Sequence, residues 1–158
     1  QVYSYQNASK AFLYSLNAKL KLNFDEHWSL HSTLSYTYAR IKTDTTNYPL
    51  DHIPPMFGKT TLQWKMKRWN SECSVLYNGW KRLEDYNLLG EDNQIYASAQ
   101  GSPAWWTLNF RSSYQLNKNF QLQLAIENVF DTYYRVFASG ISAPGRNVIA
   151  TLRYRIDR

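Results

Sequence analysis

Residues 106–126 read WTLNFRSSYQLNKNFQLQLAI and contain the pattern that decides the fold. Over 106–116 an apolar or small residue alternates with a polar one, and after a short turn at 117–119 the alternation resumes over 120–126. A period of two is typical of a β-strand that has one apolar and one polar face. Two such strands joined by about three turn residues predict an antiparallel hairpin.

The same alternation continues on both sides of this hairpin. It predicts further strands at 12–24, 28–38, 59–68, 71–83 and 147–156. No segment has a convincing helical period, so we predict an all-β fold, an antiparallel up-and-down meander of about seven strands in chain order. The predicted apolar face carries Leu108, Phe110, Leu122, Leu124, Ile126, Leu152 and Tyr154. The predicted polar face carries Arg111, Gln123, Glu127 and Arg153.

The connections between these strands alternate in length. Short turns are predicted at 25–27, 69–70 and 117–119, and long connections at 44–56, 84–103 and 131–146. Short turns on one side and long loops on the other, with strands of ten residues or more, are typical of a transmembrane barrel. Aromatic residues near the predicted strand ends suit the level of the lipid headgroups. They are Trp28, Tyr36, Tyr38, Trp69, Trp80, Trp105, Trp106 and Tyr154.

Composition limits the functional classes. The net charge of +6 leaves a nucleic-acid or anionic partner open, but the basic residues are dispersed and form no basic tract. The single cysteine, Cys73, excludes an internal disulfide and a cysteine-based zinc site. The three histidines, His27, His31 and His52, accompany no catalytic or phosphate-binding motif. We therefore expect no enzymatic activity, no cofactor and no metal site.

The strongest family signal lies near the end of the chain. Residues 124–135 read LAIENVFDTYYR, and the blocks GI at 140–141 and APGRN at 143–147 precede a last amphipathic strand. Residues 50–55 read LDHIPP. These blocks resemble the C-terminal part of the β-barrel of TonB-dependent outer-membrane receptors. The motif residues expected to have structural roles are Pro54, Pro55, Asn128, Phe130, Asp131, Tyr134, Gly140, Pro144, Gly145, Arg146 and Asn147.

The motif residues also have a physical interpretation. Asn128 and Asp131 are expected to bond neighbouring backbone groups where a strand gives way to a loop. Gly140 and Gly145 permit a positive φ, and Pro144 fixes φ before the chain re-enters the sheet. Arg146 is expected to pair with a carboxylate inside the lumen.

The resemblance implies that residues 1–158 are a single partial domain of a transmembrane barrel that closes about 22 strands around a plug. The plug and the TonB-contacting segment are expected to be absent from this sequence. The implied function is TonB-dependent uptake of a scarce ligand, such as a ferric siderophore, haem or cobalamin, across the bacterial outer membrane. The implied partners are TonB, outer-membrane lipid and the transported ligand. Ligand contacts are expected in the long loops, at Tyr48, His52, Trp80, Tyr86, Tyr133, Tyr134, Arg135 and Phe137.

Two alternatives remain at this point. A soluble basic β-barrel could bind nucleic acid by stacking bases on exposed aromatic rings, or bind a small ligand. An outer-membrane β-barrel enzyme would need a catalytic pair at a strand end, and the sequence offers none. We favour the receptor without a nucleic-acid partner. The isolated fragment is expected to self-associate, because its apolar face and its two sheet edges are built for other surroundings.

Overall fold

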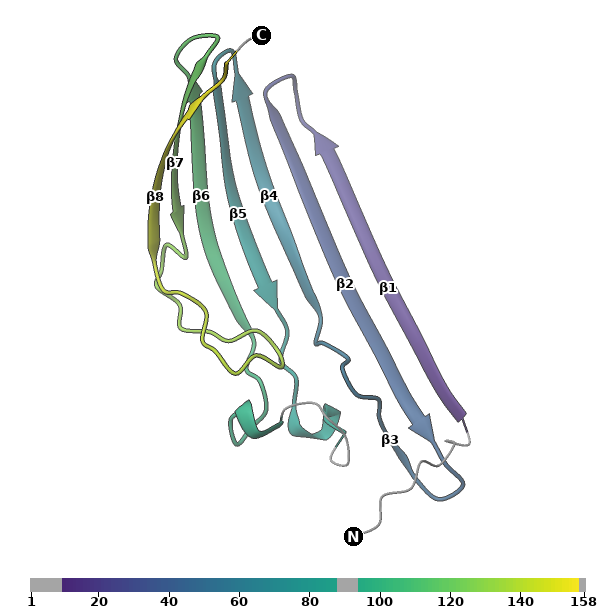
Figure 1. The fold of residues 1–158 in the computed structure, drawn as a ribbon. Helices are drawn as coiled ribbons and strands as arrows, with labels where there is room; N and C mark the ends of the chain where they lie inside the picture. Colours follow the sequence, from purple (N-terminus) through teal and green to yellow (C-terminus); the bar gives the residue numbers. More distant parts are fainter. Residues whose placement is uncertain (1–9, 88–93, 157–158) are drawn as a thin grey trace.

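The computed structural model describes residues 10–87 and 94–156, and their strands form one antiparallel sheet (Figure 1). The strands are β1 (Lys10–Asn23), β2 (Trp28–Lys42), β3 (Asn47–Pro49), β4 (Phe57–Met66), β5 (Trp69–Asn78), β6 (Trp105–Gln115), β7 (Phe120–Glu127) and β8 (Asn147–Tyr154). They pair in the order β1-β2-β4-β5-β6-β7-β8. The predicted all-β meander is confirmed.

The eighth strand is the short β3, which lies within the predicted loop 44–56. It folds back onto the end of β2, so that Tyr48 pairs with Ile41. The Thr43 N–H donates to the Thr46 carbonyl over 2.9 Å and closes the turn between the two strands. Three residues are too few to show an alternating pattern, which is why the sequence indicated a loop here.

The register brings the alternating residues of separate strands onto common faces. One row of paired residues crosses the whole sheet, in the order Leu22, Leu30, Leu62, Cys73, Phe110, Ile126 and Val148. The neighbouring row on the other face begins with Lys21, His31, Thr61 and Ser74. Leu122 pairs with Leu152, whereas Arg153 pairs with Gln121. The predicted division into an apolar and a polar face is therefore confirmed.

Figure 1 shows the short turns at one end of the sheet and the long connections at the other. In the first turn the Asp25 carboxylate accepts the backbone N–H groups of His27 and Trp28, each over 2.7 Å. The prediction of a turn at 69–70 was wrong by two residues, because Lys67 and Arg68 connect β4 to β5 and Lys67 has a φ of 50°. Apolar and polar residues alternate in both flanking strands right up to the turn, so the sequence pattern does not locate a turn of only two residues.

The long connections also differ from the predicted bounds. β5 ends at Asn78, so the connection to β6 covers 79–104 and contains two short 3₁₀ turns, η1 (Leu83–Asp85) and η2 (Gln94–Tyr96). The connection between β7 and β8 covers 128–146. The segment 79–83 was predicted as strand because apolar and aromatic residues continue into the loop.

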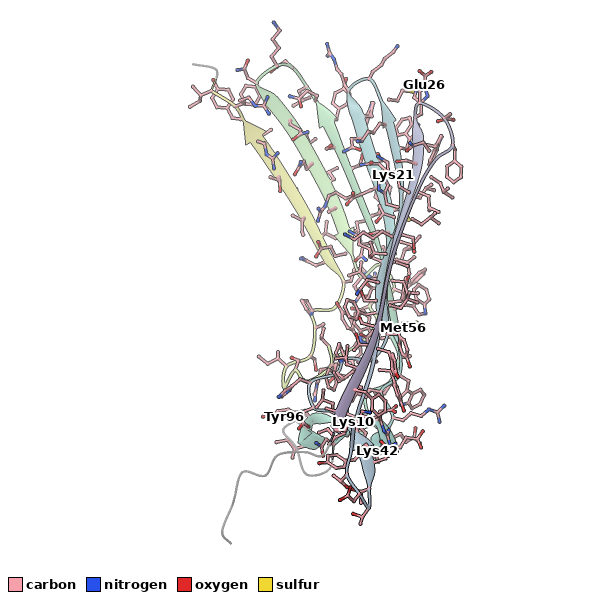
Figure 2. All side chains as sticks on the ribbon, turned by 90° about the vertical axis from the view of Figure 1, so that its right-hand side faces the viewer. Lys10, Lys21, Glu26, Lys42, Met56 and Tyr96 are labelled. Carbon is pink, nitrogen blue, oxygen red and sulfur yellow. The ribbon has the colours of Figure 1, made fainter. Side chains whose placement is uncertain are left out.

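The sheet is a single layer with side chains projecting from both faces (Figure 2). In the described part of the chain only Ala39, Tyr86 and Ala125 are buried hydrophobic residues. Large apolar residues of the strands, including Leu16, Leu124 and Leu152, are more than half exposed. β1 and β8 are the two edges and do not pair with each other, so the strands form no closed soluble barrel.

We predict that the isolated chain in detergent-free buffer self-associates. Covering about 1,000 Å² of the apolar face at roughly 25 cal/mol per Å² would gain on the order of 25 kcal/mol before entropic costs. Light scattering of the purified chain measures this directly, and added detergent should disperse the assemblies. A monodisperse monomer in plain buffer would contradict the expectation.

Candidate functional site

The three long connections, 43–56, 79–104 and 128–146, lie at the same end of the sheet (Figure 1). We call this region the loop end. Three features organise it: a hydrogen-bonded clasp around Asn128, a buried lysine, and an aromatic pocket.

Asn128 is the centre of the clasp, directly after β7. Its side chain donates to the Thr132 carbonyl over 2.9 Å and to the Pro144 carbonyl over 3.3 Å, and accepts the Thr132 N–H over 2.9 Å. Its backbone N–H donates to the Asn109 side chain on β6 over 2.9 Å. Asn128 has a φ of 50°, a conformation that Asn tolerates better than most residues. One amide therefore joins both ends of the 128–146 loop, as the motif predicted.

Asp131 makes the second link of the clasp. It has a φ of 56°, and its carboxylate accepts the Arg146 backbone N–H over 2.7 Å. The expected pairing of Arg146 with a lumenal carboxylate stays a prediction, because the observed contact is made by its backbone N–H and its guanidinium has no ion pair within the described ranges.

The two motif glycines do not have the predicted positive φ; among the described glycines only Gly101 has one. Gly145 is instead required by space, because a Cβ there would collide with the Asp131 carboxylate. A Cβ on Gly140 would meet the Tyr96 ring at 3.3 Å. Both positions are constrained by close neighbours and not by their own backbone conformation.

Lys81 is buried, with only 3% of its surface exposed. Its ammonium donates to the Ile53 carbonyl over 2.6 Å and lies 4.4 Å from the centre of the Phe137 ring and 5.1 Å from that of Tyr86. Its backbone pairs with Ser102, whose hydroxyl is 2.9 Å from the Tyr86 hydroxyl. Cation–π and hydrogen-bond contacts from one side chain thus hold the three long connections together.

An aromatic pocket of about 370 Å³ lies between the 79–104 and 128–146 connections, within the size range of small-molecule sites. Its walls include Tyr96, Trp105, Tyr133, Tyr134 and Arg135. The rings of Trp105 and Tyr134 are 4.1 Å apart, and Arg135 donates to the Tyr96 carbonyl over 2.9 Å. The Trp105 indole nitrogen is buried without a hydrogen-bond partner in the described structure. The pocket can therefore offer stacking surfaces and a cation to a ligand.

Tyr133 at the pocket edge is 81% exposed, and its hydroxyl is 2.8 Å from the Ser142 hydroxyl. The hydrogen bond with Ser142, and after it the Arg135 guanidinium, lower the pKa of the Tyr133 phenol from its ordinary value. Both contacts favour the phenolate form of Tyr133 over the neutral phenol.

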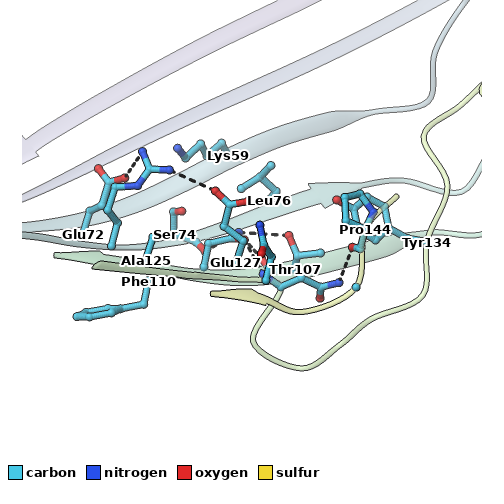
Figure 3. Close-up of a pocket in the computed structure, with 15 residues that line it drawn as sticks. Lys59, Glu72, Ser74, Leu76, Thr107, Phe110, Ala125, Glu127, Tyr134 and Pro144 are labelled. Atoms are coloured by element: carbon cyan, nitrogen blue, oxygen red, sulfur yellow. Dashed lines mark hydrogen bonds and ion pairs between the residues drawn. The ribbon is translucent and has the colours of Figure 1, made fainter. Parts of the chain in front are cut away.

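A second cavity lies on the polar face, beneath the clasp (Figure 3). Arg111 on β6 reaches Glu127 over 3.3 Å and Glu72 over 3.9 Å, as the dashed lines show. Asn128, Pro144 and Gly145 line the same cavity. The clasp thus closes one end of a charged, water-accessible surface.

The structure separates the predicted ligand contacts into groups. Tyr133, Tyr134 and Arg135 line the aromatic pocket, while Trp80 lines a separate cavity with Pro54 and Pro55. Tyr48 belongs to β3, and His52 is exposed with a φ of 61°. Tyr86 and Phe137 pack on Lys81. Ligand contact by each of these residues stays a prediction.

The sequence did not indicate Tyr96, Trp105 or Lys81 as parts of the site. Other aromatic residues of the long loops were predicted as ligand contacts, and Tyr96 could have been predicted on the same grounds. Trp105 was predicted at the lipid headgroup level, but it stacks on Tyr134 in the pocket, and its neighbour Trp106 is the exposed ring, packed on the motif residue Phe130. No feature of the sequence around Lys81 indicates that this lysine is buried.

Across residues 10–87 and 94–156, no three His, Cys, Asp or Glu side chains are grouped as metal ligands. Within the same ranges no helix has the length and apolar character needed to cross a membrane.

Comparisons with known proteins give one family model that matches most of the chain and several solved structures of similar fold. The family model described as TonB dependent receptor-like, beta-barrel, matches residues 1–129 of this chain. The copper transporter OprC superposes with a TM-score of 0.71 at 16% identity, covering 90% of this chain and 23% of OprC. The ferric enterobactin receptor PfeA of Pseudomonas aeruginosa gives 0.65 at 18% identity, covering 94% and 23%. The ferric-catecholate import receptor Fiu of E. coli K12 gives 0.62 at 18%, covering 86% and 20%. The chain spans about a quarter or less of each matched structure.

We predict that Asn128→Ala loosens the 128–146 loop. The substitution removes three side-chain hydrogen bonds and places alanine at a positive φ, a combined cost of roughly 2–4 kcal/mol. Hydrogen exchange in the full-length protein should rise in this loop and remain unchanged in β1 and β2. Asn128→Gly separates the two causes, because it removes only the side-chain bonds. Unchanged exchange in both variants would contradict the role of the clasp.

We predict that Tyr133 ionises at a lower pH than an ordinary tyrosine. Because its folded pKa is depressed, the contribution to stability exists above the unfolded pKa of about 10 and is lost as the pH falls through the folded pKa. Ultraviolet titration of the wild type minus Tyr133→Phe isolates this phenol. Ser142→Ala should raise the pKa, and Arg153→Gln at the other end of β8 should not. An ordinary pKa in the wild type would refute the arrangement.

Proposed function

The chain belongs to the TonB-dependent receptor β-barrel family, and from this membership we propose that the complete protein takes up a scarce ligand across the outer membrane in a TonB-dependent manner. The family match over residues 1–129 carries the proposal. Barrels of this family are outer-membrane proteins, so the apolar face belongs to lipid and the polar face to the lumen. The charged residues Arg111, Glu72 and Glu127 then lie in a hydrated interior, which accounts for their presence within the sheet.

In this proposal the loop end faces the outside of the cell and captures the ligand without changing it chemically. The plug and the TonB-contacting segment belong to other parts of the receptor. The aromatic pocket supports ligand capture, because stacked rings and the Arg135 cation suit an anionic, partly aromatic ligand.

For the ligand we propose a ferric siderophore in preference to haem or cobalamin. Of the three proteins named above, two are described as receptors for ferric complexes and one as a copper transporter. The pocket adds a cation and ring surfaces, and an anionic iron complex can use both.

We predict that cells producing the full receptor accumulate radioactive iron from a ferric siderophore, and that deletion of the tonB gene abolishes the uptake. Arg135→Gln should weaken binding of an anionic complex by roughly ten- to a hundredfold, because a charge-assisted hydrogen bond is worth roughly 1.5–3 kcal/mol. Arg153→Gln, the same change at the far end of the barrel, serves as the matched control. Uptake that persists without TonB would contradict the proposed mechanism, and equal losses in both variants would contradict the assigned role of Arg135.

A further inference from the structure

Four basic residues gather at the short-turn end of the sheet, and we call them the basic rim. They are Lys67 and Arg68 in the β4–β5 turn, Lys118 in the β6–β7 turn, and Arg155 directly after β8. All four are exposed. No acidic residue belongs to these three segments within the described part of the chain.

Hydrogen bonds hold the three segments of the rim side by side. The Arg68 guanidinium donates to the Leu116 carbonyl over 3.3 Å, and the Gln115 N–H donates to the Arg68 carbonyl over 2.9 Å. Asn119 and Arg155 are joined by a backbone bond of 2.8 Å and a side-chain bond of 2.8 Å. The backbone segments that carry the positive charges, and the Arg68 guanidinium, are therefore held in place along one edge.

Aromatic rings lie on the apolar face next to the rim. Trp69 and Tyr114 are paired across β5 and β6 with ring centres 4.5 Å apart, and Phe120 and Tyr154 across β7 and β8 with centres 4.7 Å apart. Rings at the edge of a lipid-facing surface mark the level of the headgroups. The basic side chains begin one to three residues beyond these rings, where phosphate groups lie.

The remaining turn at this end has the opposite charge. The β1–β2 turn contains Asp25 and Glu26, and Figure 2 shows Glu26 at the short-turn end while Lys10, Lys42 and Tyr96 lie at the opposite end. Among the segments that connect or follow the strands at this end, the basic residues are thus confined to the arc from β4 to β8.

We propose that the basic rim binds the headgroups of anionic phospholipids in the periplasmic leaflet, with the phosphates seated against Lys67, Arg68, Lys118 and Arg155 above the aromatic pairs. In outer-membrane barrels the short turns face the periplasm, which assigns the rim to that leaflet. The inference depends on the barrel family and not on the transport of any ligand. Lysine and arginine side chains are long enough to reach from the sheet to the phosphates while their aliphatic parts stay on the apolar surface.

The test uses the full-length receptor reconstituted in phosphatidylcholine vesicles that contain brominated phosphatidylglycerol or brominated phosphatidylcholine. Bromine quenches nearby tryptophans, so the two lipids give a relative binding constant, with Trp69 as a reporter beside the rim. The rim variant is Lys67→Asn/Lys118→Gln/Arg155→Gln. Asn suits the positive φ of Lys67, and Arg68 is retained because it bonds Leu116. The matched control, Lys10→Gln/Lys19→Gln/Lys42→Gln, removes the same charge away from the rim.

The rim variant should lose about fivefold or more of the preference for phosphatidylglycerol, since each basic residue near an anionic surface contributes roughly a fivefold factor. The control should retain the preference, and added salt should weaken it in the wild type. Heat-dependent gel mobility verifies that each barrel is folded. The proposal is overturned by an unchanged preference in the rim variant or by an equal loss in the control.

Discussion

The structure depends on the pairing of backbone groups between neighbouring strands. In hydrocarbon an unpaired N–H or C=O costs several kcal/mol, so strands that cross a membrane must satisfy these groups within a sheet. Along the main order of the sheet each central strand is paired on both sides over most of its length, β1 and β8 are the two edges, and the short β3 pairs with β2 alone. The absence of a conventional core follows from the same requirement, because the apolar side chains are directed at lipid and have no second protein layer to cover them.

The loop end follows a different physical rule. Its backbone cannot use a strand ladder, so side chains supply the missing partners, chiefly Asn128, Asp131 and Lys81. These contacts connect segments that are distant in the chain, and they leave the rings of Tyr133 and Tyr134 beside Arg135. A pocket built on such a fixed base loses less conformational entropy when a ligand binds than a pocket on free loops would.

Charge is arranged differently at the two ends and on the polar face. Arg111 has two carboxylate partners on the polar face, Lys81 is enclosed by rings at the loop end, and the basic rim is open at the short-turn end. Bulk composition conceals this arrangement, since a net charge of +6 is compatible with a nucleic-acid partner as much as with a membrane. The place of each charged side chain in the sheet decides whether it can contact a carboxylate, an aromatic ring or a group outside the protein.

The sequence by itself determined the seven long strands to within a few residues, their faces and the family, because alternation with a period of two is local and the motif from Asn128 to Asn147 is specific. It located the clasp for the same reason, since Asn and Asp bond the backbone groups nearest to them. Only the tertiary structure decided that Gly145 makes room for Asp131, that Trp105 turns into the pocket, and that Lys81 is buried. Each of these outcomes depends on residues brought together from different connections, and no local pattern encodes contacts over that separation.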